Sequence, residues 1–195
     1  MADLTEIRIE GRGGQGNVAA AYMLAQAAFE AGRFVQAFPS FGPERRGAPV
    51  ASFVRMSDRP IRRRCQVREP LYVIIQDQGL LHVAGAAQGV RPGGGVLINS
   101  SKTPDELGFA LTGVHVTSLA ATALATKFLG DPIPNTALLA ALLTLTGLLP
   151  LTALEAVLVH RFGGDALQRN LMLMRDVAAR VPAGSWKGRA DAPGN

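Results

Sequence analysis

The pattern of apolar and polar residues predicts short strands and helices that alternate along the chain. Ile7 and Ile9 are flanked by polar residues, which predicts a strand over residues 6–10 with one apolar face. The alanine-rich run NVAAAYMLAQAAFEA, residues 17–31, predicts a helix that ends at Gly32. Its expected apolar stripe consists of Val18, Ala21, Tyr22, Ala25, Ala28 and Phe29.

Further strands are expected up to residue 117, and helices after it. The expected strands cover residues 34–38, 50–56, 71–76, 96–99 and 114–117. Residues 61–68 are expected to pair back as an antiparallel strand, and residues 79–87 to form a short helix. Residues 118–180 have a helical pattern with glycine- and proline-rich breaks. Together these elements predict an α/β fold, a Rossmann-like, open, mostly parallel sheet with flanking helices and a helical C-terminal region.

The length of 195 residues fits one domain better than two. We expect that domain to cover residues 1–181. The remainder, PAGSWKGRADAPGN, lacks periodicity, so residues 182–195 are expected to form an irregular tail that is mobile or draped on a partner.

Cysteine usage and hydropathy exclude several classes of protein. Cys65 is the only cysteine, so the chain can form no internal disulfide, no cysteine-rich zinc site and no iron–sulfur cluster of its own. A reducing, cytoplasmic location fits this composition. The most apolar run, residues 137–151, is shorter than the roughly 20 residues of a membrane-spanning helix. A buried helix is therefore expected there, and the first residues show no signal-peptide pattern.

Positive charge is concentrated in one part of the chain. The net charge is +5, and eight arginines lie between residues 45 and 68. Such a cluster indicates an anionic partner, which could be nucleic acid, a phosphate-bearing cofactor or an acidic protein surface. Residues 55–68 contain no phenylalanine, tyrosine or tryptophan for base stacking, which disfavours nucleic acid.

A glycine-rich loop follows the first expected strand. Gly11, Gly13 and Gly16 match the pattern G-x-G-x-x-G between a strand and a helix, as in dinucleotide-binding domains. Backbone N–H groups at the start of such a helix can hold a phosphate, and glycines remove the Cβ atoms that would block its approach. Gly11, Gly13, Gly14, Gln15 and Gly16 are therefore candidate cofactor-binding residues.

The second half of the dinucleotide pattern is missing. An acidic residue is expected about 20 residues further on, where it would bind the ribose. Residues 37–40 end the second strand without a carboxylate, the next is Glu44, and Glu30 lies inside the helix. NAD bound in the usual way is therefore disfavoured. The glycines could instead allow a tight turn and close packing, or accept a phosphate or the backbone of another subunit.

A second loop, QAFPSFGPERRGAP at residues 36–49, combines prolines, glycines, two phenylalanines and an arginine pair. Prolines stiffen such a loop and glycines give it sharp bends, so we expect it to hold one shape. Phenylalanine and arginine are enriched at interfaces, which indicates a contact surface that presents Arg45 and Arg46.

Three segments together resemble one enzyme family. EGRGGQG at 10–16, AFPSFGPERRGAPVASFVR at 37–55 and PIRRRCQVREPLYVIIQD at 60–77 are similar to the gamma subunit, or gamma domain, of the 2-oxoacid:ferredoxin oxidoreductases. Residues 135–158 also resemble the C-terminal helical region of that family. The likeness extends from residue 7 to residue 180, and its most specific block lies at 36–54.

The resemblance implies a subunit of a pyruvate/ketoisovalerate-type oxidoreductase, which converts a 2-oxoacid and coenzyme A (CoA) into acyl-CoA and CO2 and passes electrons to ferredoxin or another acceptor. It implies alpha, beta and delta-type (ferredoxin-like) partner subunits. Thiamine diphosphate, Mg²⁺ and the iron–sulfur clusters are expected on these partners, because Gly164-Asp165-Ala166 lacks the rest of a thiamine diphosphate motif. This chain would help to assemble and close the active site and the CoA path.

Within that framework no residue of this chain is expected to be catalytic or to bind a metal. His82, His115 and His160 have no metal-ligand spacing. Arg45 and Arg46, and with them Arg62–Arg64, are expected to face the CoA phosphates or a partner subunit, because arginine matches phosphate and carboxylate oxygens. Neither a nucleic-acid nor a membrane partner is expected.

Two other functions stay open from the residues alone. A free-standing NAD(P)- or flavin-binding oxidoreductase would rest on the glycine pattern, and a basic nucleic-acid-binding module would rest on the net charge. Which 2-oxoacid the complex uses also stays open between pyruvate, a branched-chain oxoacid and an aryl-glyoxylate.

Overall fold

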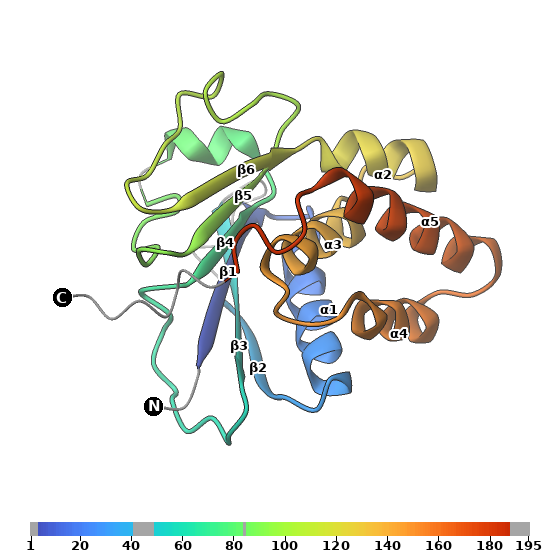
Figure 1. The fold of residues 1–195 in the computed structure, drawn as a ribbon, viewed down its shortest axis with the longest axis horizontal. Helices are drawn as coiled ribbons and strands as arrows, with labels where there is room; N and C mark the ends of the chain where they lie inside the picture. The colour runs from blue at the N-terminus through green and yellow to red at the C-terminus, as the bar shows by residue number, and fades with distance from the viewer. Residues whose placement is uncertain (1–3, 41–48, 84, 188–195) are drawn as a thin grey trace.

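A computed structural model describes residues 4–40, 49–83 and 85–187; Arg45 and Arg46 lie outside these described residues. Strands and helices alternate, as the sequence pattern predicts (Figure 1). The elements are β1 Thr5–Arg12, α1 Asn17–Glu30, β2 Phe34–Ser40, β3 Pro49–Ser57, β4 Tyr72–Ile75, the short 3-10 helix η1 Gln78–His82, β5 Gly95–Asn99, β6 His115–Leu119, α2 Ala121–Leu129, α3 Asn135–Thr146, α4 Leu151–Arg161 and α5 Gly164–Arg180.

The six strands form one sheet in the order β2-β3-β1-β4-β5-β6. Strands β1, β4, β5 and β6 run parallel to one another, and β3 is antiparallel to both of its neighbours. The prediction of an open, mostly parallel α/β sheet is confirmed. The predicted strand at residues 61–68 is wrong, because that segment has no ladder partner and its backbone carbonyls bond to an arginine side chain instead.

All five α-helices lie on one face of the sheet, which we call the helical face (Figure 1). There the alternate residues Ile7, Ile9, Val54 and Met56 join the large core under the helices. On the opposite face the pairs Val73–Val96 and Ile75–Ile98 of β4 and β5 form a smaller core under irregular segments and η1. The predicted flanking α-helices at residues 17–31 and 118–180 therefore lie on one side. The short helix expected at residues 79–87 is limited to the 3-10 helix η1, Gln78–His82, and lies on the opposite face.

Helix α1 buries the alanines of the expected stripe, Ala21, Ala25 and Ala28, but not its two aromatic residues. Tyr22 is 51% and Phe29 68% exposed, whereas Met23 and Leu24 are buried in the core. The reason is that α1 lies on β2 and β3 and is also covered by α3 and α4, so its contact surface is wide and consists largely of alanine. Spacing alone could not decide which of two overlapping apolar stripes faces the sheet.

Residues 137–146 of the apolar run at 137–151 lie in α3, inside the helical layer, and the rest of the run leads through a turn into α4. Helix α3 has Thr144 as its only residue that is not buried. Among the helices described, none combines the length and the apolar character needed to cross a membrane. The prediction of a buried helix is confirmed.

The segment after α5 returns to the sheet. Trp186 is 2% exposed and its ring stacks on Tyr72 and His115, with centroid distances of 5.9 and 6.2 Å. The backbone N–H of Trp186 donates to the Leu145 carbonyl at 2.9 Å. The expectation of a mobile or partner-draped tail is therefore wrong for residues 182–187, because the indole covers the amino ends of β4, β5 and β6.

Candidate functional site

The glycine loop lies where the strand order reverses. From β1 the chain passes through α1 to β2 and β3 on one side, and then crosses to β4 on the other side of β1. In open α/β sheets, ligands bind in the crevice beyond the carboxyl ends of the strands at such a reversal point. Here that crevice lies between residues 12–16, which follow β1, and residues 76–78, which follow β4.

The backbone of the loop depends on glycine at two positions. Gly14 has a φ of +92° and Gly16 a φ of +80°, both in the left-handed region. The loop closes on itself, because the Gln15 N–H donates to the Arg12 carbonyl at 3.1 Å and the Arg12 N–H donates to Gln15 Oε1 at 2.7 Å. Gln15, expected at the tip as a binding residue, is thus partly used to hold the turn.

Asp77 connects the glycine loop to the end of β4. Its Oδ2 accepts from Arg12 Nε at 2.7 Å and from Gln15 Nε2 at 3.2 Å, and its Oδ1 accepts from the Gly79 N–H at 2.8 Å. Burial acts to raise the pKa of Asp77, but the hydrogen bonds from Gly79, Arg12 and Gln15 together outweigh it and lower the pKa. The carboxylate therefore stays charged and fixes both walls of the crevice.

A second connection runs from Gln76 through Asn135 to Gly16. Gln76 Nε2 donates to Asn135 Oδ1 at 2.9 Å, and Asn135 Nδ2 donates to the Gly16 carbonyl at 3.1 Å. A Cβ on Gly16 would lie 2.9 Å from Asn135 Nδ2, and one on Gly11 would lie 2.8 Å from Gln76 Oε1. Both glycines therefore serve close packing against polar side chains.

The start of α1 has no side-chain cap. Gly16 is its N-cap residue, and the first turn contains no acidic residue. The Asn17 side chain bonds to the Val50 carbonyl at 2.8 Å instead of to the helix. An uncapped helix start carries partial positive charge and free N–H donors, which suits an anionic group or a peptide carbonyl.

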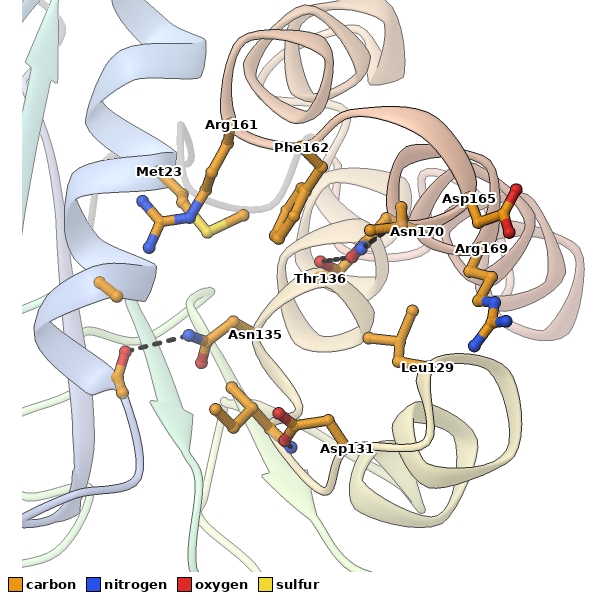
Figure 2. A pocket seen from close by; sticks show the side chains of 14 residues that line it. Met23, Leu129, Asp131, Asn135, Thr136, Arg161, Phe162, Asp165, Arg169 and Asn170 are labelled. Carbon is orange, nitrogen blue, oxygen red and sulfur yellow. Dashed lines mark hydrogen bonds between the residues drawn. The ribbon is translucent and has the colours of Figure 1, made fainter.

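Two hollows adjoin this loop on the helical face. The smaller, about 270 Å³, is lined by Gly14, Gln15 and Gln76 with residues of the segment before α3. The larger, about 540 Å³, extends from Gly16 to the junction of α4 and α5. Figure 2 shows Phe162 projecting into the larger one, with Arg161 on the side of α1 and Arg169 on the side of α2.

A third hollow, about 280 Å³, lies on the other side of the loop. It is lined by Glu10, Gly11, Ser40 and Pro49, among others. Burial raises the pKa of Glu10, although Arg8, whose Nε lies 2.6 Å from Glu10 Oε1, opposes the shift. The segment that holds Arg45 and Arg46 leaves the described chain at Ser40 and re-enters it at Pro49. Both of its ends therefore lie at the carboxyl end of β1.

The structure brings together one group of predicted residues. Gly11, Gly13, Gly14, Gln15 and Gly16 form the loop at the crevice. Sequence reasoning missed four side chains that hold this loop, namely Arg12, Gln76, Asp77 and Asn135. Gln76 and Asp77 could have been found, because they end a predicted buried strand. Asn135 carried no local signal.

The strand order bears on the dinucleotide interpretation. In that fold the second strand lies beside the first and its acidic residue faces the ribose. Here β3 lies between β1 and β2, and the residues of β3 that pair with the end of β1 are Pro49 and Val50. Among the described residues β2 is not the neighbour of β1 and its last residues, 37–40, carry no carboxylate, so the strand order disfavours NAD bound in the usual way.

Comparisons with known proteins cover almost the whole chain. A family model described as pyruvate ferredoxin/flavodoxin oxidoreductase matches residues 6–179. The pyruvate synthase subunit PorC of Methanothermobacter marburgensis is 44% identical over 86% of this chain and 92% of its own. The pyruvate/ketoisovalerate oxidoreductases common subunit gamma of Thermococcus litoralis is 41% identical over 89% and 95%. The crystal structure of the pyruvate oxidoreductase subunit PORC of Thermotoga maritima superposes with a TM-score of 0.80 at 35% identity, over 90% of this chain and 96% of that one.

Proposed function

Because this chain belongs to the pyruvate ferredoxin/flavodoxin oxidoreductase family, we propose that it acts as the gamma subunit of a multi-subunit 2-oxoacid:acceptor oxidoreductase. The observation that carries the proposal is the match of the family model over residues 6–179, which leaves no large part of the chain for another function. The reaction of the assembled complex is then the oxidative decarboxylation of a 2-oxoacid with CoA, which gives acyl-CoA, CO2, one proton and two electrons.

The cofactors of that reaction belong to other subunits in this proposal. An iron–sulfur cluster needs several cysteine ligands, and this chain has Cys65 alone. Thiamine diphosphate, with Mg²⁺, supplies the carbanion chemistry of decarboxylation when bound, and we place it with the clusters on alpha, beta and delta-type subunits. The chain is accordingly not catalytic by itself.

The contribution of this chain is a rigid wall at the active-site region. Support comes from the crevice, whose two sides are joined by the bonds of Arg12 and Gln15 to Asp77 and of Asn135 to Gly16. A loop fixed in this way presents the uncapped start of α1 in one orientation. We assign the glycine loop a contact with a neighbouring subunit or with a phosphate group that the subunit holds.

Arg45 and Arg46 are proposed to bind the CoA phosphates or a partner subunit. Support comes from the ends of their segment, because Ser40 and Pro49 lie beside Gly11 at the carboxyl end of β1.

Native mass spectrometry of the complex purified from its source tests the subunit assignment. We expect this chain in a stoichiometric assembly with larger chains that carry thiamine diphosphate and iron–sulfur clusters. Recovery of the chain as a lone monomer, or with stoichiometric NAD(P) or flavin bound to it, would overturn the proposal.

The role of the arginine pair is tested by the KM for CoA in the assembled enzyme. Arg45→Ala and Arg46→Ala should raise this KM if the arginines bind the phosphates, and weaken assembly if they bind a partner. Arg175→Ala, on the exposed side of α5, is the matched control. An unchanged KM together with intact assembly would remove both roles.

A further inference from the structure

An exposed row of arginines crosses the sheet face that has no α-helix. We call it the arginine ridge, and it consists of Arg59, Arg62, Arg63, Arg64 and Arg68. The ridge follows β3 and forms neither helix nor strand. A connecting segment of this kind is usually mobile, but here its backbone is hydrogen-bonded to a buried side chain of β3.

Arg55 fixes the ridge. It projects from β3, is 0% exposed, and donates through Nη1 to the Arg63 carbonyl at 3.3 Å and through Nη2 to the Cys65 carbonyl. Its Nε donates to Glu6 Oε1 at 2.8 Å, and its guanidinium carbon lies 5.2 Å from the centre of the Phe38 ring. A buried arginine is tolerated only when its donors are satisfied, so the bonds of Arg55 define the path of the ridge.

The ridge carries more positive charge than the described residues neutralise. Within the described ranges, Arg63 is the only ridge residue with a carboxylate within ion-pair distance, and its Nη1 lies 3.6 Å from Glu6 Oε2. Glu6 is already bonded to Arg55, and nearby Asp58 is paired with Arg33 at 2.7 Å. Like charges held side by side on a fixed backbone repel one another, and an acidic partner would remove that repulsion.

The ridge also borders a hollow that suits a side chain. This hollow, about 350 Å³, is lined by Gln36, Phe38, Arg55, Arg63 and Arg64 among others. An aspartate or glutamate side chain that entered it would meet the guanidinium groups of Arg63 and Arg64, since the donors of Arg55 are already used. A guanidinium group is planar and can bind a carboxylate through two hydrogen bonds. The edge of the ridge thus offers both positive charge and a hollow large enough for an acidic side chain.

We propose that the arginine ridge is the docking surface for an acidic patch on another polypeptide of the same complex, with one of its carboxylates in the hollow beside Phe38. This inference rests on the proposed function, since it takes the partner to be another subunit. A second copy of this chain is a poor occupant, because it carries the same net charge of +5 and the same ridge. Nucleic acid is also disfavoured, because no aromatic residue interrupts residues 59–68.

Charge reversal tests the proposal in the intact complex. A tagged chain with Arg62→Glu and Arg64→Glu is expressed in the source cells, and its assembly is measured by native mass spectrometry at rising NaCl concentration. We expect the partner to bind at least about tenfold more weakly, and the wild-type complex to dissociate as salt increases. The control, Lys127→Glu with Arg175→Glu on the helical face, should assemble as the wild type does.

The emission of Trp186 reports whether each variant is folded. Because this only tryptophan is buried against Tyr72, its spectrum shifts to longer wavelength when the chain unfolds. A folded Arg62→Glu/Arg64→Glu chain that assembles like the wild type at every salt concentration would overturn the ridge inference and leave the subunit assignment intact. If the wild-type chain itself does not assemble, the proposed function fails first.

Photo-crosslinking identifies the occupant directly. A p-benzoylphenylalanine introduced at Arg62 is irradiated in the assembled complex, and the same group at Met172, 50% exposed on α5, serves as the control. We expect position 62 to crosslink to a peptide of another subunit that is rich in aspartate and glutamate. A crosslink to a second copy of this chain or to RNA, or the same peptide from position 172, would overturn the proposal.

Discussion

Asn135 Nδ2 donates a hydrogen bond to the Gly16 carbonyl at 3.1 Å, although 119 positions separate the two residues in the sequence. The bond joins the start of α3 to the start of α1 and closes one side of the crevice. Asn135 is itself oriented by Gln76, whose Nε2 donates to Asn135 Oδ1 at 2.9 Å. The glycine pattern is thus supported by a side chain from the far half of the chain.

This contact predicts different costs for alanine at two glycines. Gly14→Ala should destabilise the protein by about 1–2 kcal/mol, because its φ of +92° is unfavourable for alanine but no atom lies within 4 Å of the new Cβ. Gly16→Ala should cost at least about 1 kcal/mol more, because its Cβ would also lie 2.9 Å from Asn135 Nδ2. Urea unfolding measures both values. If the two variants are equal, or if Asn135→Ala does not abolish their difference, the packing role of Gly16 is wrong.

The charge of Asp77 predicts a pH-dependent stability. Its pKa is lowered in the folded state, so its bonds stabilise the protein above the ordinary value of 3.8 and this stabilisation is lost as the pH falls below that value. Near neutral pH, Asp77→Asn should lower the free energy of unfolding by about 1–3 kcal/mol. The gap between wild type and variant, followed by urea unfolding at decreasing pH, should narrow below 3.8. A difference in unfolding free energy that stays constant across this pH range would contradict the role assigned to Asp77. In an Arg12→Met background the difference that Asp77→Asn makes to the unfolding free energy should narrow less as the pH falls, because Asp77 has lost one hydrogen-bond donor.

Arg55 and Glu6 predict a strong coupling inside the sheet. Arg55→Met leaves the buried Glu6 carboxylate without its 2.8 Å partner and should cost about 3–5 kcal/mol. Adding Glu6→Gln should recover part of that loss, because the remaining group is neutral. The exposed Arg62→Met is the control and should change stability by no more than about 0.5 kcal/mol. If the changes in unfolding free energy of Arg55→Met and Glu6→Gln are additive in a double-mutant cycle, the two residues do not interact as a pair.

Trp186 and Gly95 predict a second coupling, at the other end of the sheet. A Cβ on Gly95 would lie 2.4 Å from the Trp186 ring, so Gly95→Ala should strongly destabilise the wild type. Trp186→Ala should cost about 3–5 kcal/mol through the cavity it leaves. In that background Gly95→Ala should cost less than about 1 kcal/mol, because the clash is gone. Thermal unfolding of the four proteins measures the cycle, with Lys187→Ala as an exposed control.

The sequence by itself determined the order and type of most elements. Alternation around Ile7 and Ile9 and the apolar run at 71–76 predicted strands that the structure confirms, because local spacing reflects which backbone conformation can bury those side chains. It also identified the glycine loop, the buried helix at 137–151 and the family resemblance. It failed at residues 61–68, where Arg55 binds the carbonyls that a strand would have used.

Only the tertiary structure decided how these elements form a site. That β3 lies between β1 and β2, that the five described α-helices cover one face, and that Trp186 returns to the strand ends follow from contacts between distant segments. The same holds for Asn135 at Gly16 and for Arg55 beneath the arginine ridge. Polar pairs of this kind leave no periodic trace in the sequence, because each depends on burial and geometry that exist only after the chain has folded.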